Sequence, residues 1–358
     1  MDIQNLIDNH LRRKSLLSYL LSPIGAIYGI VQKVRRFLYR NGLFKSYQSK
    51  FKVISIGNIV SGGAGKTPFT IYLCKLLQAN GKKVVVSHRG YKGEYEDNTL
   101  FISNQEQIFE LALKAGDEPL LLARSLPRVP IVVGKDRTAA LKLVEESYPD
   151  TDFVLLDDSY QHLKVKHDYD FVVFNSGFGI GNGFVLPAGL LREFISSLKH
   201  VTAIIWNQLD DKHIPAELLN SGKEIIRFRY EPVGLFDIHD RSVNLEDVNK
   251  GRNALLSAIG YPKGFEKSAR DYGIDFEKHF RLSDHFDYQD MTFRERVSKA
   301  ISDEQLNSLI ITEKDFVKLQ QLPSFSVPYY ILKVKLVASD DSFIHSLLLI
   351  PEAENNHQ

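Results

Sequence analysis

A glycine-rich segment at residues 61–67, with the sequence SGGAGKT, constrains the fold of this chain more than any other feature. An apolar run at 53–56 precedes it, and a stretch of helix-forming residues at 68–79 follows it. A glycine-rich turn between a buried strand and a helix N-terminus lets backbone N–H groups surround a phosphate. The segment therefore predicts an α/β fold with a nucleotide-binding loop.

Two residues at the end of this loop carry its expected chemistry. Lys66 would neutralise the β- and γ-phosphate oxygens of the nucleotide, and the Thr67 hydroxyl would bind Mg²⁺. Val60 stands where the usual pattern has its first glycine, but the three glycines, the strand and the helix still favour a nucleotide loop. The predicted nucleotide-binding residues are Val60, Ser61, Gly62, Gly63, Ala64, Gly65, Lys66 and Thr67.

Short apolar runs alternate with helix-forming stretches along most of the chain. Strands are expected at 53–56, 83–87, 131–133, 153–156 and 171–174, and again at 203–206, 253–258 and 309–311. Helices are expected at 68–79, 105–115 and 138–147. Uniformly apolar strands that alternate with helices are typical of a parallel sheet covered on both faces. We therefore predict an α/β fold with a P-loop NTPase-type parallel sheet.

The chain has 358 residues, which is enough for two domains of ordinary size. The stretch 227–245 is rich in β-forming and turn residues, so it could be a linker or a small ribbon between two α/β lobes. The expected organisation is a membrane-associated helical segment at 1–45, a nucleotide-binding domain at 46–202, a second, smaller α/β lobe at 203–350 and a short tail at 351–358.

The N-terminal part of the chain combines an apolar stretch with a cluster of cations. Residues 16–31 are mostly apolar, but they are fewer than the roughly 20 residues needed to span a bilayer. Basic residues follow with aromatic residues between them: Lys33, Arg35, Arg36 and Arg40. This pattern indicates one of two arrangements. Either the segment lies in an anionic membrane surface with its cations on lipid phosphates, or it is a helix docked on the protein's own core. The sequence leaves both open.

The overall charge and the cysteine content exclude some classes of protein. Lys and Arg number 45 and Asp and Glu number 44, so the chain has no general attraction to nucleic acid, and we expect no nucleic-acid partner. The single cysteine, Cys74, rules out an internal disulfide and fits a reducing cytosol. Cys74 lies in an apolar stretch and is expected to be a small core residue.

Two carboxylates, Asp157 and Asp158, follow the apolar run at 153–156. Side chains at the carboxyl end of a parallel strand face the ligand edge of the sheet. In P-loop enzymes an acid in this place holds Mg²⁺, directly or through water. We therefore predict that Asp157 and Asp158 lie at a metal site together with Thr67.

Several further motifs have both a functional and a structural interpretation. The acids Asp117 and Glu118 precede Pro119 at an expected helix start, where they could simply cap the helix. The basic loop at 87–93 could contact phosphate or form a turn. The pair Asp284 and His285 lies far downstream, and the segment 312–315 has the form of a strand end followed by a helix cap.

The order of these motifs resembles the tetraacyldisaccharide 4′-kinases, the lipid A 4′-kinases of Gram-negative bacteria. The matching segments lie between about residues 50 and 320, at 55–58, 62–68, 89–91, 116–119, 134–137, 156–162, 186–193, 284–285 and 312–315. The loop of this family also lacks the first glycine, and in this chain Val60 occupies that position. Ser159 stands where the family usually has glycine and Leu190 where it usually has proline, which affects only the expected loop geometry.

The resemblance implies two α/β/α lobes joined by a short β linker, with the active site in the cleft between them. It implies ATP and Mg²⁺ as cofactors and a lipid A disaccharide 1-phosphate as the acceptor, phosphorylated on its 4′-hydroxyl. It also implies an N-terminal helix at the cytoplasmic face of the bacterial inner membrane, and hence an anionic membrane surface as a partner.

The resemblance also implies roles for individual residues. Asp117 would be the base directed at the 4′-hydroxyl, with His285 of the second lobe as its partner. Glu118 would join Thr67, Asp157 and Asp158 around the metal. Matched residues that are expected to contact the substrate are Asn58, Arg89, Arg137, Gln161 and Arg192.

Two other functions are compatible with a P-loop in this chain. The first is a soluble kinase that phosphorylates a small metabolite. The second is a P-loop switch or a metal-insertion GTPase, which would need a guanine-reading Asn/Thr-Lys-x-Asp loop. The nearest segment is Thr312-Glu313-Lys314-Asp315, in which Asp follows Lys directly without the intervening residue. The sequence therefore favours the kinase, and a comparison of ATP with GTP turnover would separate the two.

Overall fold

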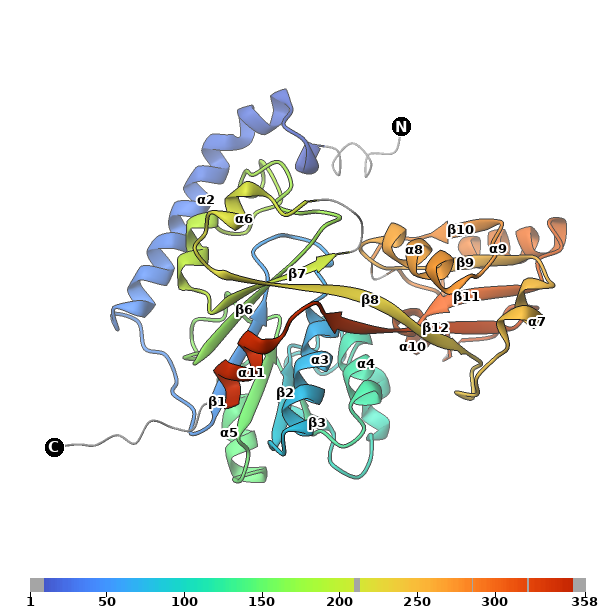
Figure 1. The fold of residues 1–358 in the computed structure, drawn as a ribbon. Helices are drawn as coiled ribbons and strands as arrows, with labels where there is room; N and C mark the ends of the chain where they lie inside the picture. Colours follow the sequence, from blue (N-terminus) through green and yellow to red (C-terminus); the bar gives the residue numbers. More distant parts are fainter. Residues whose placement is uncertain (1–9, 209–212, 285, 321, 350–358) are drawn as a thin grey trace.

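The computed structural model describes residues 10–208, 213–284, 286–320 and 322–349, which form one continuous sheet of 12 strands (Figure 1). The order across the sheet is β10-β9-β11-β12-β8-β7-β6-β1-β5-β2-β4-β3. In chain order the strands are β1 (Lys52–Gly57), β2 (Val84–His88), β3 (Leu100–Ser103), β4 (Ile131–Val133), β5 (Phe153–Asp157), β6 (Tyr169–Asn175), β7 (Ala203–Gln208), β8 (Glu224–Phe236), β9 (Asn253–Ser257), β10 (Lys278–Arg281), β11 (Ser308–Thr312) and β12 (Tyr329–Ala338). The predicted α/β fold class is confirmed.

Strands β7, β6, β1, β5, β2 and β4 form the parallel part of the first lobe. Their apolar sequences have no polar side because both faces of this sheet are buried. Ile54 and Ile56 of β1 pack into the core on one face, and Val53 packs into the core on the other. The shared direction of these strands brings the loops after β1, β5, β6 and β7 to one edge of the sheet.

Three helices of the first lobe follow from this pattern. α3 (Lys66–Ala79) and α4 (Asp117–Ser125) cover one face, where Phe69 and Leu120 share the core of Ile54. α5 (Arg137–Ser147) covers the opposite face through Leu141 and Val144. α3 starts directly after the glycine-rich loop, so its N-terminus faces the edge at which the strands end.

The second lobe repeats the same layering on a smaller scale. β10, β9, β11 and β12 are parallel, with α9 (Met291–Asp303) packed on one face through Phe293 and Val297. α8 (Pro262–Tyr272) packs on the other face through Phe265, beside α7 (Leu245–Asn249). α10 (Glu313–Leu319) follows β11 directly and lies against α4 of the first lobe.

One long strand joins the two lobes. The first half of β8 pairs in parallel with β7, and its second half pairs antiparallel with β12. β12 leads to α11 (Ser342–Leu349), whose Ile344 lies in the first lobe's core. The boundary expected at residue 203 falls between the paired strands β6 and β7. We therefore propose that the lobes change within β8, and that the stretch 227–245 contributes a strand of the connecting ribbon.

The helix α2 (Leu16–Arg40) docks on the outside of the first lobe (Figure 1). Ser15 and Ser18 form a capping box that starts it. Its contact side consists of the small residues Ser18, Gly25 and Gly29, together with Arg36, which pairs with Glu193. A Cβ on Gly25 would lie 2.6 Å from the Val185 carbonyl oxygen, and one on Gly29 would lie 2.5 Å from the Phe194 ring. Glycines therefore allow the close approach.

The outer side of α2 is apolar and exposed. The exposed side chains are Leu16, Leu17, Tyr19, Leu20, Ile24, Ile27, Tyr28, Ile30, Val31, Val34 and Phe37. Within the described part of the chain, no helix combines the length and apolar character needed to cross a membrane. The structure therefore shows the docking that one interpretation expected, and α2 also presents an exposed apolar face. Contact of this face with a membrane stays a prediction.

The helix expected at 105–115 does not form as such. Only residues Glu110–Lys114 are helical, as the 3₁₀ helix η1. The Asn104 side chain accepts hydrogen bonds from the backbone N–H groups of Glu106 and Gln107, and Phe109 bonds back to Ile102. This local turn competes with the helix, as asparagine side chains commonly do. β3 and β10, the two edge strands of the sheet, and the long strand β12 also lie outside the predicted strands.

Candidate active site

Three asparagines hold the glycine-rich loop in place. Each follows or ends a strand of the first lobe, and each side-chain nitrogen donates to a carbonyl of the loop: Asn58 to Val60 at 2.6 Å, Asn175 to Gly63 at 2.6 Å and Asn207 to Ala64 at 2.9 Å. These bonds keep the carbonyl groups on the strand side. The first N–H groups of α3, which have no partner within the helix, stay available to a phosphate.

Two glycines of the loop are required by their surroundings. Gly65, the N-cap of α3, has φ +91°, and a Cβ there would lie 2.3 Å from the amide nitrogen of Asn207. A Cβ on Gly63 would lie 3.3 Å from the Cα of Gly260 in the second lobe. The second lobe therefore approaches the nucleotide loop closely, at a point where side chains would keep them apart.

The loop and the two acids after β5 form one cluster. The Thr67 hydroxyl donates to Asp157 at 3.0 Å, and Lys66 lies 3.4 Å from Asp158. Arg192 lies 3.9 Å from the same oxygen of Asp158. The predicted nucleotide residues and two of the predicted metal residues therefore lie at one place, at the carboxyl edge of the sheet.

The two neighbouring acids have opposite electrostatic environments. Burial raises the pKa of Asp157, and the charges of Glu118 and Asp158 act in the same direction. Burial would also raise the pKa of Asp158, but Lys66 and then Arg192 outweigh it and hold that pKa below its usual value. Asp158 therefore remains ionised beside two cations, whereas Asp157 is fully buried under the loop.

Glu118 is held by a histidine of one lobe and a lysine of the other. His88 Nδ1 accepts the Gly90 N–H at 3.0 Å, so in the neutral imidazole the proton is on Nε2, which lies 3.2 Å from Glu118. Lys314 Nζ lies 3.2 Å from Glu118 and 3.0 Å from Asp284. Burial opposes ionisation of Glu118, but the His88 hydrogen bond and the Lys314 charge hold its pKa well below its usual range.

Asp117 lies at the first turn of α4, where its carboxylate is 2.8 Å from Lys318 of α10. The N-cap of this helix is Gly116, so Asp117 is not the capping residue that the simple structural interpretation assumed. Its neighbour Glu118 and its partner Lys318 place it in the same contact between the lobes. The predicted partner His285 lies outside the described residues.

The oxygen ligands around the loop suit Mg²⁺. Within the described residues no three His, Cys, Asp or Glu side chains are grouped closely enough to hold a metal alone. Mg²⁺ needs no such cage, because it keeps several waters and is bound by one or two carboxylates together with substrate phosphates. Thr67, Asp157 and Asp158 are a donor set of this kind, with Glu118 coupled electrostatically to both acids.

The residues expected to contact the substrate occupy different positions. Arg192 is the one of the five that lies beside a side-chain carboxylate of the acidic pair, that of Asp158. Gln161 donates to the Asn58 carbonyl at 2.8 Å, and both support the loop. Arg137 is buried and donates to the Asp157 carbonyl at 2.7 Å, which holds the end of β5, whereas Arg89 is exposed and pairs with Glu96. Their contacts with a substrate stay a prediction.

Sequence reasoning missed four residues of this site. Asn175 and Asn207 end apolar runs that were predicted as strands, so their polar side chains at a strand end were the available signal. Lys314 lies in the segment 312–315, which was noted as a helix cap, as part of the family match and as a rejected guanine-reading loop, and Lys318 lies shortly after it. Nothing in the linear sequence indicates which acids these two lysines contact.

Comparisons with known proteins give a consistent result. The sequence pattern of the family described as tetraacyldisaccharide-1-P 4′-kinase matches residues 17–350. A tetraacyldisaccharide 4′-kinase of Geobacter sulfurreducens is 33% identical over 338 residues, which cover 93% of each chain. One from Pelobacter propionicus is 33% identical over 308 residues, covering 86% of this chain and 84% of the relative.

A solved structure agrees with these relatives. LpxK from Aquifex aeolicus, crystallised in complex with ATP, superposes with a TM-score of 0.73 at 26% sequence identity. The match covers 93% of this chain and 99% of that chain. The similarity therefore extends over both lobes and is not confined to the nucleotide loop.

Proposed function

Because this chain belongs to the tetraacyldisaccharide-1-P 4′-kinase family, we propose that it transfers the γ-phosphoryl group of ATP to the 4′-hydroxyl of a lipid A disaccharide 1-phosphate. One observation carries the proposal: the Lys66–Asp158 and Thr67–Asp157 contacts lie beside acids of α4 that the second lobe pairs with its own lysines. This arrangement has a donor side and an acceptor side.

The donor side binds and orients the nucleotide. The N–H groups at the start of α3 donate hydrogen bonds to phosphate oxygens of the nucleotide, and Lys66 neutralises charge on the β- and γ-phosphates. Mg²⁺, held by Thr67, Asp157 and Asp158 with Glu118 nearby, supplies further neutralisation at the phosphate oxygens when it is bound. Arg192 holds Asp158 ionised and in place.

The acceptor side removes the proton. As the oxygen of the 4′-hydroxyl forms its bond to phosphorus, the bond from phosphorus to the leaving oxygen of ADP breaks, and Asp117 accepts the hydroxyl proton. Lys318, 2.8 Å from the Asp117 carboxylate, orients that carboxylate before the acceptor arrives. In this proposal His285 supports Asp117 from the second lobe, so that the base is complete only when the lobes are together.

We further propose that the enzyme works at the cytoplasmic face of the inner membrane, on a lipid whose sugar reaches the protein from the bilayer surface. The exposed apolar side of α2 supports this placement, because a contiguous row of large apolar side chains on a soluble surface marks a protein or membrane contact. The exposed cations Lys33 and Arg40 lie at the end of that row, where lipid phosphates would meet them. Arg36, which the sequence grouped with them, is buried and pairs with Glu193 instead.

The direct test is incubation of the purified protein with ATP, Mg²⁺ and a lipid A disaccharide 1-phosphate in neutral detergent micelles. The expected product carries a second phosphate at the 4′-position, mapped by NMR. A product phosphorylated elsewhere, or turnover only on a water-soluble sugar, would contradict the proposal. Replacement of ATP by GTP tests the switch-type GTPase, which would hydrolyse GTP without an acceptor.

A further inference from the structure

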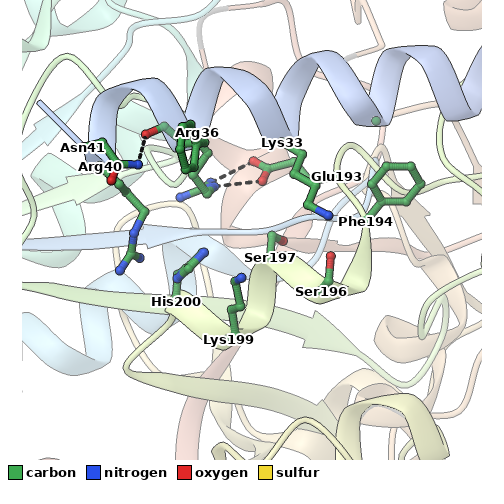
Figure 2. A pocket seen from close by; sticks show the side chains of 12 residues that line it. Lys33, Arg36, Arg40, Asn41, Glu193, Phe194, Ser196, Ser197, Lys199 and His200 are labelled. Atoms are coloured by element: carbon green, nitrogen blue, oxygen red, sulfur yellow. Dashed lines mark hydrogen bonds and ion pairs between the residues drawn. The ribbon is translucent and has the colours of Figure 1, made fainter. Parts of the chain in front are cut away.

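A cavity of about 140 Å³ lies between the C-terminal half of α2 and η2 (Ile195–His200), as Figure 2 shows. A site for a single water needs only about 10 Å³, so this space is large enough for a bulkier polar group. Gly29 and Phe194 line the cavity at a point where the helix closely approaches the first lobe. The cavity is therefore part of the α2 docking surface and not a gap in the core.

The cavity carries an excess of positive charge. Its basic residues are Lys33, Arg36, Arg40, Lys199 and His200. The carboxylate that lines it, Glu193, is fully engaged, because both of its oxygens accept from Arg36, at 3.0 and 2.8 Å. Among the described residues no carboxylate pairs with Lys33, Arg40 or Lys199. Three cations of the cavity therefore lack a counter-ion.

A buried hydroxyl adds to this picture. Ser197 lines the cavity and is 9% exposed, and its hydroxyl oxygen has no hydrogen-bond partner among the described residues. A buried polar group without a partner is costly unless a ligand or water completes it. Burial, followed by the charges of Arg40 and Lys199, lowers the pKa of the neighbouring His200 to about 4. The positive charges around the cavity therefore disfavour protonation of His200, which lines it.

The position of the cavity relates it to both the membrane and the active site. The exposed apolar row of α2 ends at Phe37, beside the cations of the cavity. Glu193, on the cavity wall, is the next residue after Arg192, which contacts Asp158. A lipid headgroup in the cavity would thus lie at the end of the apolar row, and its site adjoins, along the chain, a residue that contacts the acidic pair.

We propose that this cavity binds a phosphomonoester group carried by a lipid. Such a group has up to two negative charges and three strong acceptor oxygens, which match several Lys and Arg donors and a free hydroxyl. The group could belong to the acceptor, as its 1-phosphate, a source that rests on the proposed function. It could equally belong to a phospholipid of the membrane.

Vesicle binding tests the site without any kinase assay. The full-length protein is floated with phosphatidylcholine vesicles that contain either phosphatidic acid, a phosphomonoester, or phosphatidylglycerol, a phosphodiester, at matched surface charge. Diffuse attraction depends only on surface charge, so a difference between the two lipids reports on a specific site. We expect the wild-type protein to bind the phosphatidic acid vesicles at least about fivefold more tightly. This is the change in affinity that one Lys or Arg typically contributes near a lipid surface.

Two double variants remove the same number of charges at different places. Lys33→Gln with Lys199→Gln alters the cavity, whereas Lys14→Gln with Lys45→Gln removes exposed lysines that do not line it. The cavity pair should lose the preference for phosphatidic acid. The control pair should bind both vesicles more weakly by the same factor and keep the preference.

The source of the phosphate follows from acceptor kinetics of the same variants. If the 1-phosphate of the acceptor occupies the cavity, the cavity pair should raise the KM for the phosphorylated acceptor by up to about thirtyfold, because the roughly fivefold effects of two lost cations multiply. The KM for an acceptor without that phosphate should not change. An unchanged KM for acceptors with and without that phosphate assigns the site to a membrane phospholipid. Equal wild-type binding to the two vesicles, or a preference that survives in the cavity pair, overturns the proposal even if the kinase activity is established.

Discussion

Adjacent residues in this site have different partners, which supports the different tasks proposed for them. Asp117 and Glu118 follow each other in α4, but Asp117 contacts Lys318 whereas Glu118 contacts His88 and Lys314. A similar division separates Asp157, which receives the Thr67 hydroxyl, from Asp158, which faces Lys66. Residue type alone assigns four acids to the site, and only their partners distinguish a base from a metal ligand.

The role of Asp117 as the base gives the sharpest prediction at this scale. Asp117→Asn keeps the size of the side chain but cannot take a proton, so kcat should fall by about 10²–10⁴. The KM for ATP should stay nearly unchanged, because Asp117 is not on the nucleotide loop. Steady-state kinetics with melting temperatures measure both effects, and Asp150→Asn, an exposed acid, is the control.

A double-mutant cycle extends this test to the partner that the resemblance implies. If Asp117 and His285 act as a unit, Asp117→Ala and His285→Ala together should lower kcat little more than Asp117→Ala alone. Additive losses, or losses that follow the melting temperature, would mean that the two do not act together.

Two histidines make the stability of the protein depend on pH. Burial, assisted by neighbouring cations such as Arg137 and Arg40, lowers the pKa of His162 and of His200 to about 4. Both titrate near 6.5 in an unfolded chain, so between these values the unfolded state binds protons that the folded state does not. The contribution of these two histidines to the free energy of unfolding should be fully present above pH 6.5. The free energy of unfolding should then decrease as the pH falls towards 4.

Urea midpoints measured from pH 7.5 to pH 5 check this dependence. His162→Gln and His200→Gln should each flatten the profile, since each removes one group that must stay neutral in the fold. His239→Gln, at an exposed position, serves as the control. An unchanged profile in both variants would show that other groups cause the acid sensitivity.

At the scale of elements, the nucleotide loop depends on strand ends that lie far from it in sequence. Asn207→Ala and Asn175→Ala each remove an amide that holds a loop carbonyl. A lost buried hydrogen bond with an orphaned acceptor costs about 1–3 kcal/mol. If that cost appears in nucleotide binding, the Kd for ATP should rise about tenfold or more.

A matched asparagine separates a loop effect from general destabilisation. Asn253 is buried in the second lobe, and its amide likewise donates to backbone carbonyls. Asn253→Ala should lower the melting temperature without a change in the Kd for ATP, measured by calorimetry. Equal loss of ATP affinity in all three variants would remove the special role of the first two.

The docking of α2 depends on its missing side chains. Gly29→Val places methyl groups against the Phe194 ring, and such overpacking should cost about 1–3 kcal/mol. Ala26→Val adds similar bulk on the exposed side of the same helix and should be nearly neutral. Melting temperatures compare the two, and Phe194→Ala combined with Gly29→Val should restore part of the loss. No recovery would indicate that the helix is held elsewhere.

At the scale of the whole molecule, partly buried ion pairs join the lobes beside the active site. Lys314 connects Glu118 of the first lobe with Asp284 of the second. Burial alone would lower the pKa of Lys314, but the charges of these two carboxylates outweigh it and raise that pKa above its usual value. The two carboxylates are 29% and 30% exposed. Loss of the lysine should therefore cost nearer the low end of the 3–5 kcal/mol typical of a broken buried pair, about 3 kcal/mol.

Lys314→Met tests this link, with unfolding in urea and steady-state kinetics as the measurements. Stability and kcat should both fall, because the lobes lose a contact at the acids of α4. Lys267→Met breaks an exposed pair with Asp271 and should cost under about 0.5 kcal/mol. Retention of full activity by the Lys314 variant would argue against a closed arrangement of the lobes in catalysis.

The sequence by itself determined the parts of this protein that local interactions control. The apolar runs, the glycines before Lys66 and the acids after β5 predicted the α/β class, the nucleotide loop and one edge of the sheet, because each depends on neighbours in the chain. The ordered motifs also indicated the family, which the comparisons confirm. The local turn at Asn104 was a competing signal that the helix prediction overlooked.

The tertiary structure decided everything that depends on contacts between distant segments. Asn207 lies 143 positions from Ala64, and Lys314 lies 196 positions from Glu118, yet each pair is joined by a hydrogen bond. Such partners are chosen by strand order and by the packing of α10 against α4, which no local pattern encodes. The docking of α2, with small residues and the buried Arg36 inside and apolar residues outside, follows for the same reason, since the surface that receives the helix lies more than 150 residues away in the chain near Phe194.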